Sequence, residues 1–240
     1  MHDANLSLSL DNRLLRALPD DELRLLRPHL EFASYRPGVI LAEPGDKVRR
    51  CYFPGKGMIS LLSVTEQGNT VEVGYTGREG MVGLAALLGK NEILYQQLVQ
   101  SETDCLVADA AVVQDLFDRG GEFHDLLLRY MYALLKQISQ TCVCNHFHTI
   151  EARLCRWLTV MCERSSSGRL AVTQEFLAHM LGVQRTSIGL IANAMQRAGI
   201  IRYSRGIVEI IDFDRLKASA CECYSIVNAE YENLFKKKRR

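Results

Sequence analysis

The spacing of apolar residues divides the chain into a short helical segment near its start, a strand-rich region and a helical second half. Residues 11–30 contain seven leucines interrupted at Pro19, which predicts two short helices. From residue 32 to about residue 109 the apolar runs are short, and Gly and Pro separate them at even intervals. Short strands in such a series are typical of a β-sandwich or a β-roll.

Residues 122–148 form the longest segment with helical periodicity. A heptad seam recurs along it at alternating spacings of four and three, made of Leu127, Met131, Leu134, Ile138 and Thr141. Such a seam either is buried within its own domain or meets a partner copy. Leu128, Leu135 and Cys142 form a second stripe, so two faces need cover. We expect one face to pack on the β-domain and the other to form a dimer.

Residues 149–163 predict another helix, and residues 173–199 predict two helices joined by a tight turn. Thr173 is a good N-cap for the first of the two, and Gly182 is a good stop. The second runs over residues 184–198 and ends at Gly199. Apolar side chains recur on both, with the small Ala178 where the helices approach each other. An ordinary helical hairpin and a helix-turn-helix motif both fit this pattern.

The residues that follow favour the helix-turn-helix. Residues 200–211 predict two short β-branched strands around the turn Ser204-Arg205-Gly206, which together make a basic-tipped hairpin. Two helices followed by such a hairpin form a winged helix-turn-helix. From Asp212, which is a good N-cap, one last helix is expected to run to about Phe235.

With this segment as its most specific part, nearly the whole chain resembles the Crp/Fnr family of bacterial transcription regulators. The resemblance implies an α+β fold with an N-terminal double-stranded β-roll (a jelly roll) similar to cyclic-nucleotide-binding domains. It implies a long dimerisation helix and a C-terminal winged helix-turn-helix. We expect the β-roll domain at residues 1–120, the dimerisation helix at 121–148 and the DNA-binding domain at 149–240. A homodimer, double-stranded DNA and RNA polymerase are the partners that the resemblance implies.

The outer face of the second helix of the pair carries the candidates for DNA recognition. Side chains there suit base edges in a major groove, and those predicted to read bases are Gln184, Arg185, Thr186 and Ser187. Side chains predicted to contact phosphate are Thr173, Asn193, Arg202 and Arg205. Many family members place a glutamate directly after the arginine, where this chain has Thr186, and a basic residue where it has Leu190. The family's usual target sequence is therefore not assumed.

The effector site departs from that of the family's cyclic-nucleotide binders. Those carry Gly-Glu, small residues and then Arg followed by Ser or Thr; the glutamate takes the ribose hydroxyl and the arginine pairs with the phosphate. Here no arginine lies between Arg78 and Arg119. Because burying a phosphodiester without a cation is costly, we expect Glu79 to serve a turn and the effector not to be a standard cyclic nucleotide. A cyclic-nucleotide-responsive regulator of the same fold is the alternative.

The cysteines and histidines near residue 145 form a possible metal-binding motif. Cys142 with His146, and Cys144 with His148, are i,i+4 pairs that each share one face of a helix. Two ligands per face complete a four-ligand site only with a dimer mate. We expect packing or capping roles for these side chains, and no metal.

The remaining cysteines give no stronger indication of a bound metal. Cys221 and Cys223 are expected on opposite sides of a helix, and no cysteine precedes Cys51, which excludes an N-terminal four-cysteine iron–sulfur cluster. The sequence thus predicts no metal site and no cofactor.

An enzyme is the interpretation from another class. The β-roll is shared with cupin-like metal enzymes, whose metal needs a histidine cluster on the strands. No histidine lies between Leu30 and Phe123, and no phosphate-binding loop or nucleophile elbow occurs elsewhere. We therefore expect no catalytic residues.

Charge separates the two halves of the chain. Residues 1–148 carry 14 basic against 19 acidic side chains, a net charge of −5, while residues 149–240 carry 15 against 9, a net charge of +6. An acidic front half and a basic back half suit a sensor joined to a nucleic-acid reader. The basic tail 236–240 either aids solubility or adds attraction to phosphate. The N-terminus lacks the design of a secretory signal and no apolar stretch spans a bilayer, so we expect a cytoplasmic protein with no membrane partner.

Overall fold

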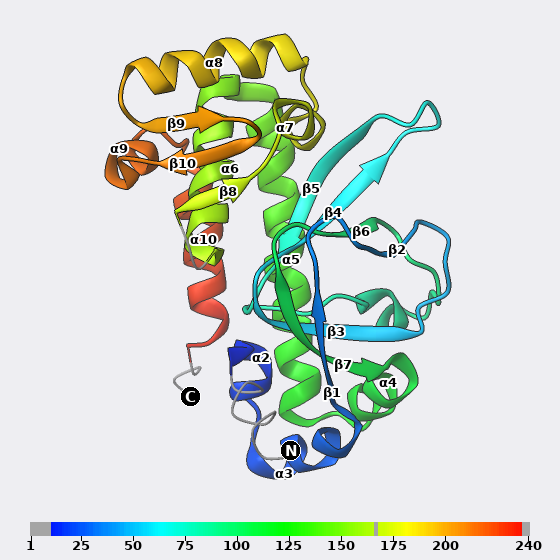
Figure 1. Cartoon of the computed structure of the whole chain (residues 1–240). Coiled ribbons are helices and arrows are strands. Elements are labelled where there is room, and N and C mark those ends of the chain that lie inside the picture. Colours follow the sequence, from blue (N-terminus) through cyan, green and yellow to red (C-terminus); the bar gives the residue numbers. More distant parts are fainter. Residues whose placement is uncertain (1–10, 166–167, 237–240) are drawn as a thin grey trace. The chain divides into compact units, whose positions relative to one another are not determined.

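The computed structural model describes residues 11–165 and 168–236, which form two compact units (Figure 1). Of the described residues, the first unit comprises 11–61, Gly74–Leu135 and 230–236. The second comprises Leu62–Val73 and Lys136–Ala229. Residues 166–167 and 237–240, which include most of the predicted basic tail, lie outside the described residues.

The first part of the chain contains the predicted helical edge, the predicted strands and most of the long helix. Its elements are α2 (Arg13–Arg16), α3 (Asp20–Leu26), η2 (Arg27–His29), β1 (Glu31–Tyr35), β2 (Ile40–Ala42), β3 (Arg50–Lys56), β4 (Ile59–Val64), β5 (Thr70–Thr76), η3 (Leu84–Leu88), β6 (Gln96–Val99), β7 (Thr103–Asp109), α4 (Ala110–Asp118) and α5 (Gly121–Phe147). The helix predicted over residues 122–148 is confirmed as α5. Helix α4 was not predicted, and its apolar positions Val113, Leu116 and Phe117 are buried at helical spacing.

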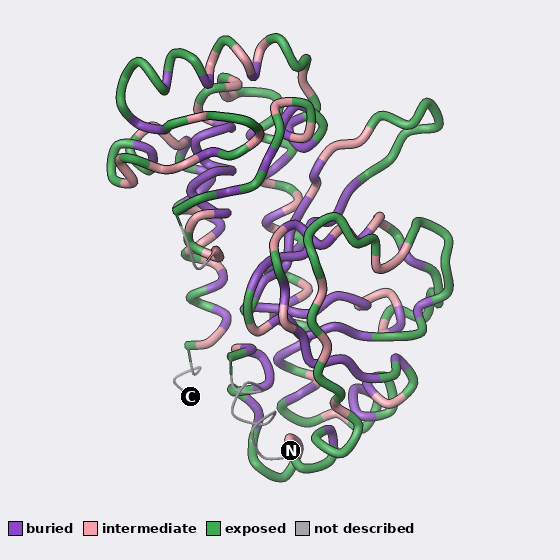
Figure 2. Tube along the Cα trace, viewed as in Figure 1, coloured by how far each residue is buried: buried purple, intermediate pink, exposed green. Residues whose placement is uncertain are grey.

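The strands form two sheets, in the orders β1-β7-β3 and β2-β6-β4-β5. Strand β7 is central in the first sheet and pairs antiparallel with β1, from Glu31 opposite Val107 to Tyr35 opposite Thr103. Strand β3 is the other edge of this sheet, which is why it can hold Pro54 beside an irregularity in its register. Both β3 and β7 are largely buried (Figure 2).

One face of α5 is built into the core of the first unit. Phe123, Leu127 and Tyr130 are at most 1% exposed, and their spacing of three and four puts them on one side of the helix. Each such side chain contributes roughly 1.5–3 kcal/mol by leaving water. The Tyr130 hydroxyl donates to the Met81 carbonyl oxygen at 3.0 Å and lies 3.0 Å from the Thr76 hydroxyl. Its ring occupies the space beside Gly80, where an added Cβ would come within 2.3 Å.

The elements that follow α5 lie in the second unit, except for the end of α10 from Glu230 onward, which belongs to the first unit. These are α6 (Ile150–Arg164), β8 (Arg169–Ala171), α7 (Gln174–Leu181), α8 (Arg185–Arg197), β9 (Ile201–Ser204), β10 (Ile207–Ile210), α9 (Phe213–Ala218) and α10 (Cys223–Leu234). The three short strands form one sheet in the order β8-β10-β9. The predicted α+β class, with strands first, a long helix, and a helix pair followed by a hairpin, is therefore confirmed.

The prediction of one last helix from residue 213 to about residue 235 is wrong. Helix α9 ends at Ala218, with Ser219 as its C-cap, and α10 begins only at Cys223. Leu216 in α9 and Cys223 at the start of α10 are both buried, so each side of the break is held by packing. Ser and Cys are weak helix formers, and burial of the cysteines here overrides helical continuity. As a result, Cys221 and Cys223 do not point to opposite sides of one helix.

No helix in the part of the chain that the structure describes has the length and apolar character needed to cross a bilayer.

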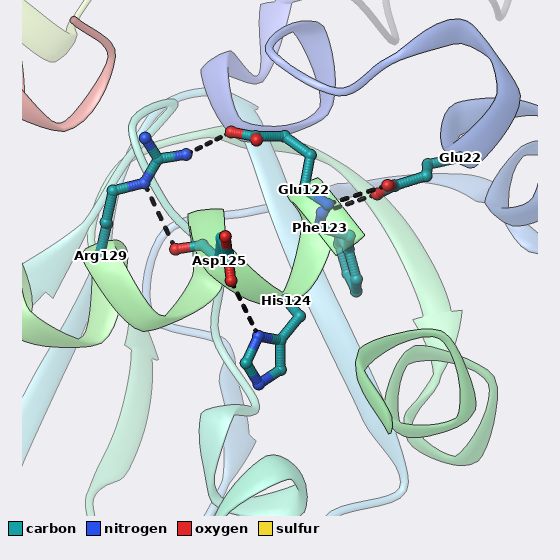
Figure 3. A network of polar contacts seen from close by, with 6 residues as sticks. All are labelled: Glu22, Glu122, Phe123, His124, Asp125 and Arg129. Carbon is teal, nitrogen blue, oxygen red and sulfur yellow. Dashed lines mark hydrogen bonds and ion pairs between the residues drawn. The ribbon is translucent and has the colours of Figure 1, made fainter. Parts of the chain in front are cut away.

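The N-terminus of α5 is capped from a distant segment by Glu22 (Figure 3). Its carboxylate accepts hydrogen bonds from the backbone N–H of Glu122 at 2.9 Å and of Phe123 at 2.6 Å. The first N–H groups of a helix have no intrahelical partner, and a negative charge there also suits the helix dipole. Glu122 in turn binds Arg129 further along the helix. Glu22 therefore attaches α3 to the start of α5.

Removal of this cap should destabilise the first unit. We expect Glu22→Ala to lower the free energy of unfolding by about 0.5–2 kcal/mol, the usual cost of losing a helix cap. Urea denaturation followed by circular dichroism measures the change. Glu66→Ala is the matched control, because Glu66 is an exposed turn residue with no hydrogen bond to a described residue. Equal effects of the two substitutions would show that the contact from Glu22 contributes nothing specific.

Candidate nucleic-acid interface

Helices α7 and α8 are joined by the predicted tight turn. The Thr173 hydroxyl caps α7 by accepting from the Phe176 N–H at 3.0 Å. Gly182 ends α7 with a left-handed φ of 62°, a conformation that costs glycine little. Gln184 is the N-cap of α8 and makes no side-chain capping bond to that helix. The cap and the stop predicted for this pair are both confirmed.

The inner faces of the two helices are buried together. Leu177 and Ile188 are at most 1% exposed, and Ala178 is buried where the helices approach. Helix α6 lies beneath them: its Trp157 ring meets Phe176 edge-on at 6.3 Å between centroids. Arg153 of α6 donates to the Leu181 carbonyl at the end of α7. Burial lowers the pKa of Arg153, since its guanidinium is removed from water under the helix pair. Packing against α6 and α7 thus fixes the position of α8 and of the side chains on its opposite face.

That opposite face is exposed where the sequence predicts base reading (Figure 2). Gln184, Arg185 and Thr186 are exposed in the first turn of α8, and Ser187 is half-buried. Among the described residues Arg185 has no hydrogen-bond or ion-pair partner, so its guanidinium is available to a ligand. The four side chains lie at the helix N-terminus, the end that enters a major groove in helix-turn-helix proteins.

Further along α8 the surface changes character. Asn193 is exposed, as expected for a phosphate contact, and Leu190 places an apolar side chain, 72% exposed, on the same helix. Gly189 is half-buried, because the Gln174 side chain lies only 3.2 Å from where a Cβ of residue 189 would be.

The wing is a two-residue hairpin between β9 and β10. Arg205 and Gly206 have φ of 49° and 77°, and Ser204 pairs directly with Ile207 across them. Two successive positive φ values define the type I′ turn, whose twist matches the flanking strands. The turn lies against the start of α7, since a Cβ at Gly206 would be 3.5 Å from the Thr173 methyl group.

The two arginines of the wing are in different environments. Arg202 forms an ion pair at 3.0 Å with Glu209, which lies directly opposite on β10. Arg205 projects from the turn, is exposed and has no charged partner among the described residues. Its charge is therefore more available to phosphate than that of Arg202.

Helix α5 exposes a stripe other than the predicted seam. Leu127, Leu134 and Thr141 are buried within the single chain, while Met131 and Ile138 are half-buried. The large apolar side chains that α5 exposes are Leu128, Tyr132, Leu135, Val143 and Phe147. Leu128 and Leu135, the second predicted stripe, are 46% and 62% exposed.

The β-roll holds two features that bear on an effector. Glu79 is buried and its carboxylate accepts from the Gly77 N–H at 3.1 Å, the turn role that the sequence predicts. Elsewhere a cavity of about 410 Å³ is lined by Lys47, Arg49 and Arg50 together with Tyr52 and Asp46. Burial raises the pKa of Tyr52 to about 12, so its hydroxyl remains a neutral donor and acceptor.

Sequence reasoning missed one group of side chains. Cys144, His148, Cys221 and Cys223 come together with their donor atoms within 4.8 Å of one another. The other predicted pair, Cys142 and His146, stays exposed and takes no part. The i,i+4 spacing of Cys144 and His148 was the available signal, but the break before α10 was needed to add the two distant cysteines.

Comparison with known proteins agrees with this architecture. The cyclic nucleotide-binding domain family matches residues 32–119, and the Crp-like helix-turn-helix domain family matches residues 152–219. Among curated proteins none matches the chain by sequence.

Several solved structures share the fold. A protein assigned to the Crp/Fnr transcriptional regulators, from Eubacterium rectale, superposes with a TM-score of 0.70 at 16% identity, covering 86% of this chain and 97% of its own. FixK2 from Bradyrhizobium japonicum has a TM-score of 0.67 at 12% identity, covering 80% and 98%. The c-di-GMP-responsive global regulator CLP from Xanthomonas campestris has a TM-score of 0.59 at 17% identity, covering 80% and 99%.

Both domain families match in the order that the Crp/Fnr regulators combine them, and the strands, α5, the helix pair and the wing complete the same arrangement. Members of this family are DNA-binding transcription regulators rather than enzymes, and they typically act as dimers. This chain belongs to the Crp/Fnr family of transcription regulators.

Proposed function

We propose that the chain is a homodimeric regulator that reads a palindromic DNA site with α8 in the major groove. The observation that carries the proposal is the exposed, unpaired Arg185 in the first turn of a helix whose other face is packed on α6 and α7. The planar guanidinium group of Arg185, carried by this packed helix, can donate two hydrogen bonds to guanine, the contact that arginine commonly makes in a major groove. Gln184, Thr186 and Ser187 then contact neighbouring bases.

Phosphate contacts orient the same surface on the duplex. The wing turn that carries Arg205 lies against Thr173 at the start of α7 through Gly206, and Asn193 lies further along α8. Arg202 contributes less, because Glu209 already neutralises part of its charge. Such contacts give affinity and register without sequence information. We also propose contact with RNA polymerase and action in the cytoplasm, as for other regulators of this kind.

Dimerisation through α5 is supported by its exposed stripe. Two copies of α8 that read successive turns of one DNA face must lie roughly 34 Å apart, which requires a fixed two-fold partner. Leu128, Tyr132 and Leu135 recur at spacings of four and three on the exposed side of α5. We therefore propose that this stripe makes the dimer contact, with Met131 and Ile138 at its margin and Leu127, Leu134 and Thr141 packed inside each chain.

Charges placed on the stripe should separate the dimer. We expect the double variant Leu128→Glu with Leu135→Glu to sediment as a monomer and to lose most of its affinity for a palindrome, because two desolvated carboxylates would face their copies. Sedimentation velocity and fluorescence anisotropy measure the two effects. Leu94→Glu is the control, since Leu94 is 68% exposed and lies outside α5. A tight dimer retained by the double variant would contradict the proposed interface.

Arg185 should distinguish base reading from general DNA attraction. One bidentate arginine–guanine pair discriminates by roughly 1–3 kcal/mol, so Arg185→Ala should cost about 2–6 kcal/mol on the specific site if the two halves add. Random DNA should be barely affected. The measurement is an anisotropy titration at fixed salt, on a site selected from random sequence and on a scrambled duplex.

Arg205→Asn is the matched comparison at the wing. Asparagine tolerates the left-handed backbone of this position, so the turn is kept while the charge is removed. We expect similar weakening on both duplexes and a flatter salt dependence, because fewer counterions are released. If Arg185→Ala also weakened both duplexes equally, Arg185 would be a phosphate contact and not a reader of bases.

We further propose that the β-roll domain responds to a signal other than a standard cyclic nucleotide. The absence of an arginine between Arg78 and Arg119 supports this, as does the use of Glu79 within its own turn. The basic cavity at Lys47, Arg49 and Arg50 suits an anionic effector at a different place. The alternative, a cyclic-nucleotide-responsive regulator, is favoured by the family match over residues 32–119.

Calorimetric titration separates these two possibilities. Cyclic AMP and cyclic GMP should show no binding below the millimolar range. The segment that follows Glu79 lacks the arginine that pairs with the nucleotide's phosphate in the family's cyclic-nucleotide binders. Cyclic di-GMP is included as a third ligand, since CLP is described as responsive to it. A micromolar dissociation constant for either mononucleotide would contradict the proposal.

A further inference from the structure

Three thiols and one imidazole meet where α5 ends in the second unit. The sulfurs of Cys144 and Cys221 are 3.5 Å apart, and the sulfur of Cys223 is 3.4 Å from Nδ1 of His148. All four donor atoms lie within 4.8 Å of one another. The three cysteines are buried, and His148 is half-buried.

The backbone brings the four together from two segments far apart in sequence. His148 follows Cys144 by one helical turn, and its N–H donates to the Cys144 carbonyl oxygen at 3.2 Å. Cys221 and Cys223 flank Glu222 in the break between α9 and α10, a connection that can be followed in Figure 1. A continuous helix would have turned these two cysteines apart, so the break is what lets both face Cys144.

We propose that Cys144, His148, Cys221 and Cys223 bind one zinc ion in a tetrahedral Cys₃His site. Zinc–sulfur bonds of about 2.3 Å in a tetrahedron place sulfurs roughly 3.8 Å apart, close to the separations found here. Three soft thiolates and an imidazole are the donor set that zinc prefers in sites of structural type. With four protein ligands the site is closed, leaving no position for a substrate.

Side chains around the four donor atoms form hydrogen bonds of the kind that orient the ligands of a bound metal ion. Oε1 of Glu222 lies 3.1 Å from Nε2 of His148, on the ring nitrogen opposite the cysteines. A carboxylate at that position fixes the imidazole with Nδ1 as the metal-binding nitrogen. The Gln140 side-chain amide donates to the Cys223 sulfur at 3.2 Å, the kind of contact that stabilises a ligating thiolate.

Core packing, a disulfide and an iron–sulfur cluster each fit these four side chains less well than zinc does. Cysteines that only fill a core need no imidazole and no ordered carboxylate beside them. A disulfide between Cys144 and Cys221 needs sulfurs about 2.05 Å apart and would give Cys223 and His148 no role. An iron–sulfur cluster needs room for several iron and sulfide atoms between its ligands, whereas donors within 4.8 Å enclose a single ion.

A zinc ion here would crosslink the end of α5 to the junction of α9 and α10. Because the metal binds only the folded arrangement, its binding free energy adds to the stability of the unit that carries the DNA interface.

Elemental analysis and native mass spectrometry of the full-length protein test the site. Protein prepared with reductant and zinc should retain one zinc per chain, and replacement by Co(II) should give thiolate charge-transfer absorption with the visible bands of a tetrahedral ion. Removal of zinc by a strong chelator should lower the melting temperature, and added zinc should restore it. A chain without metal, iron with acid-labile sulfide, or a Cys144–Cys221 disulfide under these conditions would overturn the proposal.

Substitutions locate the ion. Cys221→Ser and Cys223→Ser should each lose the stoichiometric zinc and the Co(II) spectrum, whereas Cys142→Ser and His146→Ala should retain both. Cys142 and His146 have the same i,i+4 spacing as Cys144 and His148 and lie on α5 outside the cluster, so these two variants are matched controls. Retention of one zinc by Cys223→Ser, or its loss in Cys142→Ser, would overturn the assignment.

Substitution of Glu222 tests the site while all four zinc ligands stay in place. Glu222→Gln should keep one zinc per chain but weaken its affinity by about 10–100-fold, the usual effect of losing an outer-shell partner. Competition with a chromophoric chelator measures this on folded protein, even if the cysteine variants fail to fold. An unchanged affinity would contradict the role of Glu222 in orienting His148.

Discussion

Burial of one face of α5 is the constraint on which much of the structure depends. Phe123, Leu127 and Tyr130 are removed from water, and the Tyr130 hydroxyl is satisfied by Met81 and Thr76. A buried hydroxyl without such partners would oppose folding, so the polar contacts and the apolar packing must form together. Since side chains on a helix have fixed relative directions, the buried face also decides which residues point outward. Leu128 and Leu135 are exposed for this reason.

The DNA interface follows the same logic on a smaller scale. Ile188, Ala192 and Met195 bury the inner face of α8, while Arg185, the first residue of the helix, stays exposed. A side chain held this way loses little freedom when it binds, because the helix beneath it is already ordered. Charge in the wing is distributed unevenly: Glu209 balances Arg202, while Arg205 at the turn remains unbalanced among the described residues.

The buried cysteines of the chain fall into two chemical environments. Cys51, Cys105 and Cys155 are each buried among apolar groups, and burial raises the pKa of each thiol to about 12. Such thiols behave as small apolar side chains. The group at the end of α5 differs because its sulfurs converge with an imidazole that a carboxylate orients. Proximity of several soft donors, and not the presence of cysteine, is what distinguishes a ligand set from core packing.

Local patterns were sufficient for the parts of the protein whose geometry is local. The cap at Thr173, the stop at Gly182 and the turn at Arg205 each depend on a few neighbouring residues, so the sequence identified the helix pair and the wing. The length of α5 was likewise evident from its periodicity. The sequence could not decide which stripe of α5 is covered, because Leu127 and Leu128 differ in burial only through what packs against them.

The cysteine cluster marks the limit of sequence reasoning most clearly. The sequence pattern predicted a continuous helix across residues 219–222, in which Cys221 and Cys223 would face apart. Packing against Cys144 breaks that helix, and 77 residues of chain separate the two sulfurs that meet. No periodicity within either segment contains this contact. Its existence depends on the free energy of the whole fold, so only the tertiary structure reveals it.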